Sequence, residues 1–250
     1  MSKYELQARA AAASGVSYEQ SEMILQHKDS LMEVIGGHDG FVELSRLFYH
    51  SVFDRHSPVY HDQHQQQKQH STTNYDWFLN IFASSTQDEA IDNQATFLTQ
   101  VFGGPALYSQ RKQLAPHKPL RLVGRHANYN IGHQAADLWI RHMEYALQHH
   151  SAFCTKQKTS ATTTTTTTTS TSGTNTTTTA TDTSIKIPSG DMFVVLLQQK
   201  DPMTLQKALL DYFQYTAHYI VVASDYMRSD QVRNGRHTTS LLNAHALLYK

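Results

Sequence analysis

Apolar residues recur every three or four positions along much of the chain, a spacing that brings side chains to one face of a helix. Four stretches show it best, with apolar positions at Phe41, Leu44, Phe48 and Val52; Ile91, Ala95, Leu98 and Val101; Ala136, Trp139, Met143, Ala146 and Leu147; and Leu205, Leu209, Tyr212, Phe213, Ala217, Ile220 and Val221. Residues 19–35 are also expected to be helical, and MFVVLL at 192–197 fits a strand or a helix. No alternating strand-and-turn rhythm appears elsewhere, so the predicted fold class is all-α.

Three local signals predict where the main helices begin and end. Thr86 followed by Glu89 is a capping-box pattern ahead of the second apolar stretch. The sequence Gly-Gly-Pro at 103–105 is expected to stop that helix. Asp201 followed by Pro202 is typical of a helix start, which places the last helix after residue 201.

Two polar segments interrupt the helical pattern. Residues 61–76 are rich in Gln and His, and residues from about 155 to 190 include eight consecutive threonines, at 162–169. Neither segment has enough apolar side chains to offset the entropy cost of ordering it. Threonine is β-branched and competes for backbone hydrogen bonds, which disfavours a helix. We therefore expect two long disordered insertions.

Composition narrows the partners and the compartment. The chain has 21 basic and 21 acidic residues, so neither nucleic acid nor a membrane is expected as a partner. No apolar run is long enough to span a membrane. The single cysteine, Cys154, excludes an internal disulfide and fits a reducing compartment. The N-terminus lacks a secretory pattern, so a cytoplasmic location is expected, although an Ala-rich start with few acids leaves organellar targeting open.

Common catalytic motifs are missing from the sequence. It has no P-loop, no GxGxxG, no GxSxG and no HExxH. Three histidines of the Gln-rich segment, at 61, 64 and 70, are metal-ligand candidates, but such polar tracts often carry histidine without binding a metal. Cys154 has no base placed near it by sequence, so we do not expect it to be a nucleophile.

His126 raises a different chemistry. A neutral imidazole in a helical protein can supply the one strong axial ligand that a haem iron needs, leaving the opposite face open for a gas. Such a site also needs an apolar slot between helices and cationic or hydroxyl groups for the propionates. On residue type alone, His126 is more often an ordinary side chain, and aromatic residues at helical spacing are more often core packing.

Several motifs together resemble one family. FLTQVFGGPALY at 97–108 is followed by an Arg-His pair at 125–126 and by DLWIRHM at 137–143. RLFYHSVF at 46–53 and TLQKALLDYFQYTAHYIVV at 204–222 complete the series. The series resembles the truncated haemoglobins, in particular their second group. The resemblance implies a globin-like two-on-two helical sandwich and a haem b cofactor.

The resemblance also implies roles for individual residues. His126 resembles the proximal iron ligand, and Tyr49 and Trp139 resemble the distal hydrogen-bond donors to bound oxygen. Gln94 falls at a distal position that varies in the family, and Ala90 falls where larger globins place a distal histidine. The remaining counterparts are the aromatic wedge Phe82 and two propionate partners, Tyr108 and Arg125.

The sequence departs from the family pattern at four places, one of which is the long insertion at 151–200 that joins the last two main helices. The insertion at 61–76 separates the distal helix from Phe82, and about five extra residues separate Tyr108 from Arg125. Asn128 and Tyr129 stand where the family usually has a Pro-Phe pair. The predicted organisation is an extension at 1–30, partly helical or disordered, a globin domain at 31–226 with insertions at about 61–76 and 155–190, and a tail at 227–250.

The function expected from this resemblance is reversible binding of oxygen, and of other small diatomic gases, at a His-ligated haem iron. Two alternatives stay open. One is a haem enzyme that detoxifies nitric oxide or peroxide, which would need an external reductase because the chain has no flavin or nicotinamide motif. The other is a helical interaction protein without haem, since fold does not fix function.

Overall fold

The computed structural model describes residues 2–61, 75–115, 120, 122–126, 129, 131–154 and 190–234. Both predicted insertions lie almost entirely outside these residues. Every regular element in the described ranges is helical, which confirms the all-α prediction. In chain order the elements are α1 (Lys3–Ser14), α2 (Tyr18–Gln26), α3 (Lys28–Ile35), α4 (Gly37–Phe53), α5 (Pro58–His61), α6 (Asp76–Leu79), the 3₁₀ turn η2 (Asn80–Phe82), α7 (Gln87–Val101), α8 (Leu107–Arg111), α9 (Leu122–His126), α10 (His133–His149), α11 (Gly190–Gln198) and α12 (Pro202–Asn234).

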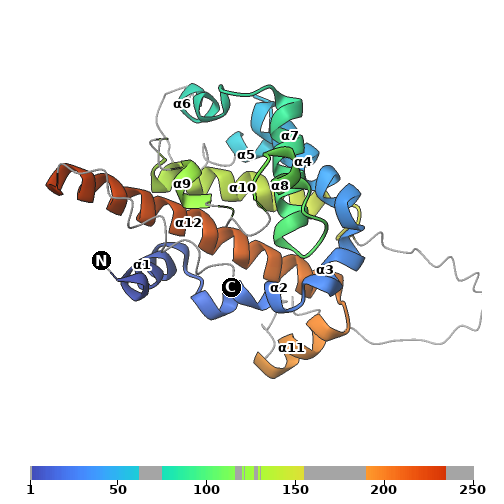
Figure 1. The fold of residues 1–250 in the computed structure, drawn as a ribbon. Coiled ribbons are helices and arrows are strands. Elements are labelled where there is room, and N and C mark those ends of the chain that lie inside the picture. The colour runs from blue at the N-terminus through green and yellow to red at the C-terminus, as the bar shows by residue number, and fades with distance from the viewer. Residues whose placement is uncertain are drawn as a thin grey trace, which may run out of the picture.

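The four predicted main helices, α4, α7, α10 and α12, form two packed pairs. Helix α4 packs on α7, helix α10 packs on α12, and contact between α4 and α10 joins the pairs (Figure 1). This arrangement confirms the predicted two-on-two sandwich. At its centre, Phe41 of α4 stacks on Phe102 with ring centroids 5.6 Å apart, and Phe102 contacts Tyr212 of α12 at 5.1 Å. The core therefore lies where the two pairs meet.

The predicted helix ends are confirmed. The Glu89 N–H donates to the Thr86 hydroxyl at 3.2 Å, and the Glu89 carboxylate accepts from the Thr86 N–H at 3.0 Å, which completes the capping box of α7. That helix ends just before Gly103, whose φ of +89° suits glycine. At the start of α12, the Asp201 carboxylate accepts from the Thr204 N–H at 2.8 Å. Capping side chains thus satisfy backbone donors at both helix starts.

Other elements refine the expectations. Residues 19–35 form two helices rather than one, because the backbone turns at His27 between α2 and α3. Residues 192–197 are helical and belong to α11. Helices α1 and α2 pack along α12, and α12 continues past residue 226, where the predicted tail begins (Figure 1). A second apolar cluster, separate from the main core, is buried where α1 and α2 meet α12. Its buried members are Leu6, Ala10, Val16, Val123, Tyr215, Tyr219, Val222 and Ala223.

The described residues contain no helix long and apolar enough to cross a membrane. Within the same ranges, no group of three or more His, Cys, Asp or Glu side chains is arranged to hold a metal ion. The histidines at 64 and 70 lie outside the described residues, and for residue 61 only the backbone is described. Cys154 is a free, exposed thiol.

Candidate functional site

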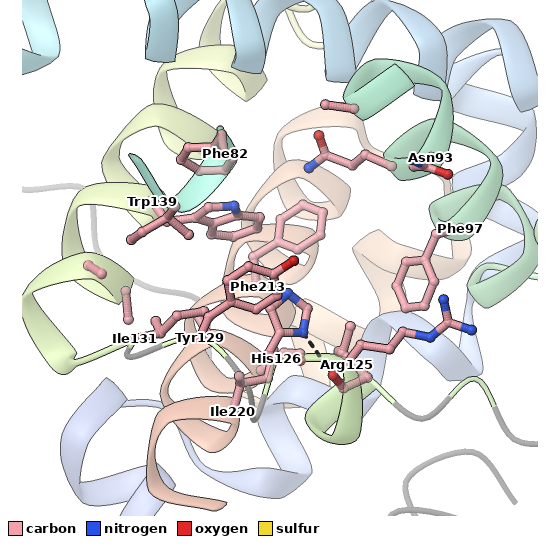
Figure 2. A pocket seen from close by; sticks show the side chains of 18 of the residues that line it. Phe82, Asn93, Phe97, Arg125, His126, Tyr129, Ile131, Trp139, Phe213 and Ile220 are labelled. Atoms are coloured by element: carbon pink, nitrogen blue, oxygen red, sulfur yellow. Dashed lines mark hydrogen bonds between the residues drawn. The ribbon is translucent and has the colours of Figure 1, made fainter. Parts of the chain in front are cut away.

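One cavity of about 460 Å³ brings the predicted site together (Figure 2). Its walls come from α4, α6, η2, α7, α8, α9, α10 and α12. All seven residues predicted from the sequence line it: Tyr49, Phe82, Gln94, Tyr108, Arg125, His126 and Trp139. Ala90, at 6% exposure, lines it as well. Residues far apart in the chain thus converge on one space of ligand size, while the role of each remains a prediction.

His126 is the last residue of α9, and its ring is held by its own helix. The Nδ1 atom lies 2.8 Å from the carbonyl oxygen of Leu122, drawn as a dashed line in Figure 2. A carbonyl only accepts, so Nδ1 carries the proton and Nε2 of the neutral ring keeps its lone pair. Burial lowers the pKa of His126 below its ordinary value, although the Leu122 bond opposes this shift. Near neutral pH the ring therefore offers a free nitrogen ligand.

A second wall, which we call the distal wall, consists of Tyr49, Phe82, Gln94 and Trp139. Figure 2 shows Phe82 and Trp139 on the side of the cavity away from His126. The Tyr49 ring meets Phe82 edge-on at 5.9 Å. Burial raises the pKa of Tyr49 well above its ordinary value, so its hydroxyl stays protonated and available as a donor.

Polar atoms on this side of the cavity lack partners within the protein. The buried amide oxygens of Gln94 and Asn93 have no hydrogen-bond partner among the described residues. The Tyr49 hydroxyl and the Trp139 indole N–H, on two residues that line the cavity, form no hydrogen bond with another described residue. Buried polar groups are normally paired. Unpaired O–H and N–H donors facing an apolar cavity therefore favour a ligand that accepts hydrogen bonds.

A third side of the cavity is cationic. The Arg125 guanidinium lies 4.7 Å from the centre of the Tyr108 ring and donates to the Tyr108 hydroxyl, and its Nε donates to the Leu120 carbonyl at 3.0 Å. Lys112 also lines the cavity. Figure 2 shows Arg125 on the side opposite Trp139. Two cations and a hydroxyl at one edge suit carboxylate groups of a ligand.

A model of the bacterial-like globin family matches residues 30–172, more than half of the 250-residue chain. The chain belongs to the bacterial-like globin family. This membership confirms the resemblance seen in the sequence and implies a haem cofactor.

Two curated plant globins are similar to this globin. Two-on-two hemoglobin-3 of Arabidopsis thaliana is 36% identical over 142 residues, which cover 57% of this chain and 66% of the plant protein. Group 2 truncated hemoglobin 3-1 of Lotus japonicus is 36% identical over 107 residues, which cover 43% of this chain and 50% of the relative. The matched region spans less than two thirds of either relative's length.

The cavity of this globin fits a haem in its donor set. His126 offers the single free imidazole nitrogen, and Arg125 with Lys112 offers cationic partners for propionates. Between them the lining is mainly aromatic and aliphatic, contributed by Phe82, Phe97, Leu98, Ile131, Ala135, Ala136, Phe213, Ala217 and Ile220. A flat apolar ring system with an acidic edge matches these surfaces.

Several lining residues were not found from the sequence. Lys112 follows Tyr108 by four residues, one helical turn, but the short helix α8 has no apolar periodicity that would have predicted it. Tyr129 also lines the cavity, and its hydroxyl lies 3.5 Å from the Ser84 hydroxyl across the opening. Arg228 donates to the Tyr129 carbonyl at 3.1 Å. The sequence signal for Tyr129 was its place where the family usually has a Pro-Phe pair.

Proposed function

We propose that this globin binds haem b, that His126 would hold its iron, and that the bound haem would reversibly take up dioxygen or another small diatomic gas. When bound, the haem supplies a ferrous iron that coordinates the gas. The observation that carries the proposal is the pairing, in one cavity, of a free His126 Nε2 with unpartnered donors on Tyr49 and Trp139.

The chain's own residues divide this task between them. Burial keeps His126 neutral, and the hydrogen bond to the Leu122 carbonyl fixes the orientation of its ring. The lone pair of Nε2 is therefore held toward the cavity. Tyr49 and Trp139 present O–H and N–H groups in a largely apolar cavity, where they would stabilise partial negative charge on a bound dioxygen. Phe82 and the apolar lining would exclude water from that ligand. Arg125 and Lys112 would neutralise the propionates.

The distal wall also argues against a haem-less interaction protein. Such a protein has no ligand to accept from the Tyr49 hydroxyl and the Trp139 indole N–H, and leaving buried polar groups unpaired costs free energy. Nitric oxide or peroxide chemistry remains a second use of the same site. It requires an external reductase, and no feature of the described residues favours it over binding. A cytoplasmic location stays a prediction from the sequence, which also leaves organellar targeting open.

Absorption spectra of the purified protein test the proposal. The reduced protein under nitrogen is expected to show a ferrous haem spectrum, to change on adding oxygen, and to return when oxygen is removed. Carbon monoxide is expected to displace the oxygen. A protein that carries no haem, or that oxidises at once without a reversible oxygen spectrum, contradicts the proposal.

A separate measurement distinguishes binding from turnover. The oxygenated protein is mixed with one equivalent of nitric oxide without a reductase, and then with an electron donor present. A single stoichiometric conversion to nitrate and ferric haem, without further turnover when the donor is present, supports a binding function. Fast, repeated conversion of nitric oxide to nitrate with the donor present contradicts a binding function and supports the enzymatic alternative.

A further inference from the structure

A buried polar chain lies directly behind the distal wall. His142 of α10 is fully buried, and its Nδ1 lies 2.8 Å from the hydroxyl of Ser51 on α4. The Ser51 hydroxyl in turn lies 2.8 Å from the hydroxyl of Ser57, which precedes α5. Both serines are also buried. The chain therefore ties α10 to α4 and to the start of α5 through hydrogen bonds that are shielded from water.

This bond lies one helical turn from the proposed donor Trp139 on α10 and one turn from Phe48 on α4, which packs against both donors. His142 follows Trp139 by three residues on α10, and Ser51 follows Phe48 by three residues on α4, so each pair shares a helix face. Phe48 contacts both Trp139, at 5.2 Å, and Tyr49, at 4.9 Å. The Ser51–His142 bond and the Phe48–Trp139 contact are thus successive contacts of one interface. Together they fix how α4 and α10 are aligned.

The same histidine closes a loop of five rings, one of which is that of Tyr49. His142 stacks on Phe78 at 5.8 Å, Phe78 meets Phe82 at 5.3 Å, and Phe82 meets Tyr49 at 5.9 Å. Tyr49 meets Phe48 at 4.9 Å, and Phe48 meets His142 at 6.4 Å. Protein interiors are close-packed, so moving one ring shifts its neighbours. His142 is the ring of this loop that a directional bond anchors to α4.

We propose that His142 and Ser51 are positioning residues, which set the placement of the donors Tyr49 and Trp139 and thereby the strength with which the pocket holds its ligand. The proposal rests on the proposed function, because it assigns those two side chains the donor role. Neither His142 nor Ser51 lines the cavity, so they act through the rings and helices they hold.

The hydrogen bond is also stable to ordinary changes of pH. Burial lowers the pKa of His142 to about 3, with a smaller contribution from Arg141, so the imidazole is neutral near pH 7. The groups packed around the ring are Phe48, Phe78 and Tyr60, none of which is charged. The alignment of α4 and α10 is therefore expected to persist over the working range of a cytosolic globin.

The test compares variants of the full chain that remove hydrogen bonds at two places along the contact between α4 and α10. Ser51→Ala removes the hydroxyl, and His142→Phe keeps a ring but removes Nδ1. The matched control is His150→Phe, because His150 is equally buried and its Nε2 donates to the Gly40 carbonyl of α4 at 2.9 Å. Gly40 lies nine residues before Tyr49, roughly 13 Å along the helix.

Two readouts are needed, one of which requires no haem. The first is the NMR signal of the Trp139 indole N–H in the haem-free protein. The chain has two tryptophans, so Trp77→Phe assigns it. The second is the oxygen dissociation rate, with the C–O stretching frequency of the carbon monoxide complex as a report on the field at the ligand. All variants are also compared by melting temperature.

Ser51→Ala and His142→Phe are expected to move the indole signal, raise the C–O stretching frequency and speed oxygen release about three- to tenfold, a fraction of the loss from deleting a donor outright. His150→Phe is expected to lower the melting temperature without these changes. If the positioning variants lower only the melting temperature, His142 has a purely structural role and the proposal is wrong. If the parent takes up no haem, the proposed function fails, and the indole signal still decides the positioning claim.

Discussion

Removing the two distal donors is expected to speed oxygen release without unfolding the pocket. Tyr49→Phe deletes one oxygen atom from a ring that remains packed against Phe48 and Phe82. The deleted hydroxyl is bonded to no other described residue, so no partner is left unpaired. The free energy of unfolding should therefore change little, and the effect should appear in ligand kinetics.

The expected magnitude follows from the charge on the ligand. A hydrogen bond to a charged group contributes roughly 1.5–3 kcal/mol, and about 1.4 kcal/mol corresponds to a tenfold change. Tyr49→Phe or Trp139→Phe should then raise the oxygen dissociation rate roughly ten- to a hundredfold. Carbon monoxide carries less charge when bound, so its release should respond much less. Stopped-flow mixing of the oxygen complex with excess carbon monoxide measures the rate.

The Gln94 side chain can compensate for a deleted donor, because it lines the same wall and its amide N–H is a donor. The double variant read as a double-mutant cycle separates such re-aiming from independent contributions. Tyr60→Phe is the matched control, since it removes a buried hydroxyl that donates to the Val52 carbonyl at 2.6 Å and does not line the cavity. Oxygen release from the double variant at the parent rate would refute the distal network.

Four further outcomes are expected. Below pH 6.5, the ordinary pKa of histidine, residue 142 takes up a proton in the unfolded chain, whereas buried His142 of the folded protein stays neutral down to about pH 3. The free energy of unfolding should therefore fall by up to about 1.4 kcal/mol per pH unit as the pH drops through that window. Urea unfolding of His142→Phe should show a shallower decline, and an equal slope would contradict this. Lys112→Leu should raise the rate of haem loss to a scavenger protein about two- to fivefold, and an unchanged rate would remove Lys112 from the haem edge. Thr86→Ala should cost about 1 kcal/mol of stability through the lost helix cap, which urea unfolding measures. Deleting residues 157–182 should leave haem uptake intact, because the tract offers almost no apolar side chain; loss of haem-loaded protein on deletion would show that it is structural.

The main helices and the proposed ligand could be predicted because their signals are local. Helical spacing marked α4, α7, α10 and α12, and the Thr86–Glu89 pattern marked the start of α7. His126 and Trp139 belong to short motifs that resemble a known family, so the cavity could be anticipated from residue identity. The packing of α4 on α10 then placed Tyr49 near Trp139 through Phe48.

Contacts between residues that lie far apart in the chain had no comparable signal in the sequence. Ser51 and His142 are 91 residues apart, and the bond between them follows only from how α4 meets α10. A hint was present, because His142 lies on the same helix face as Trp139, where a polar residue needs a buried partner. No glycine or proline marks the break at His27 between α2 and α3, so the sequence did not predict it. Short helices such as α8 contain too few residues to show a period.

The central claim, that His126 is the protein's ligand to a haem iron, is tested most directly by His126→Gly in the presence and absence of free imidazole. The account predicts that the variant retains haem poorly, and that imidazole, filling the space of the missing ring, restores retention and the ferrous carbon monoxide spectrum. His149→Ala, which removes an exposed histidine at the end of α10, should match the parent. A His126→Gly protein that keeps its haem with an unchanged absorption spectrum, with or without imidazole, would contradict the assignment.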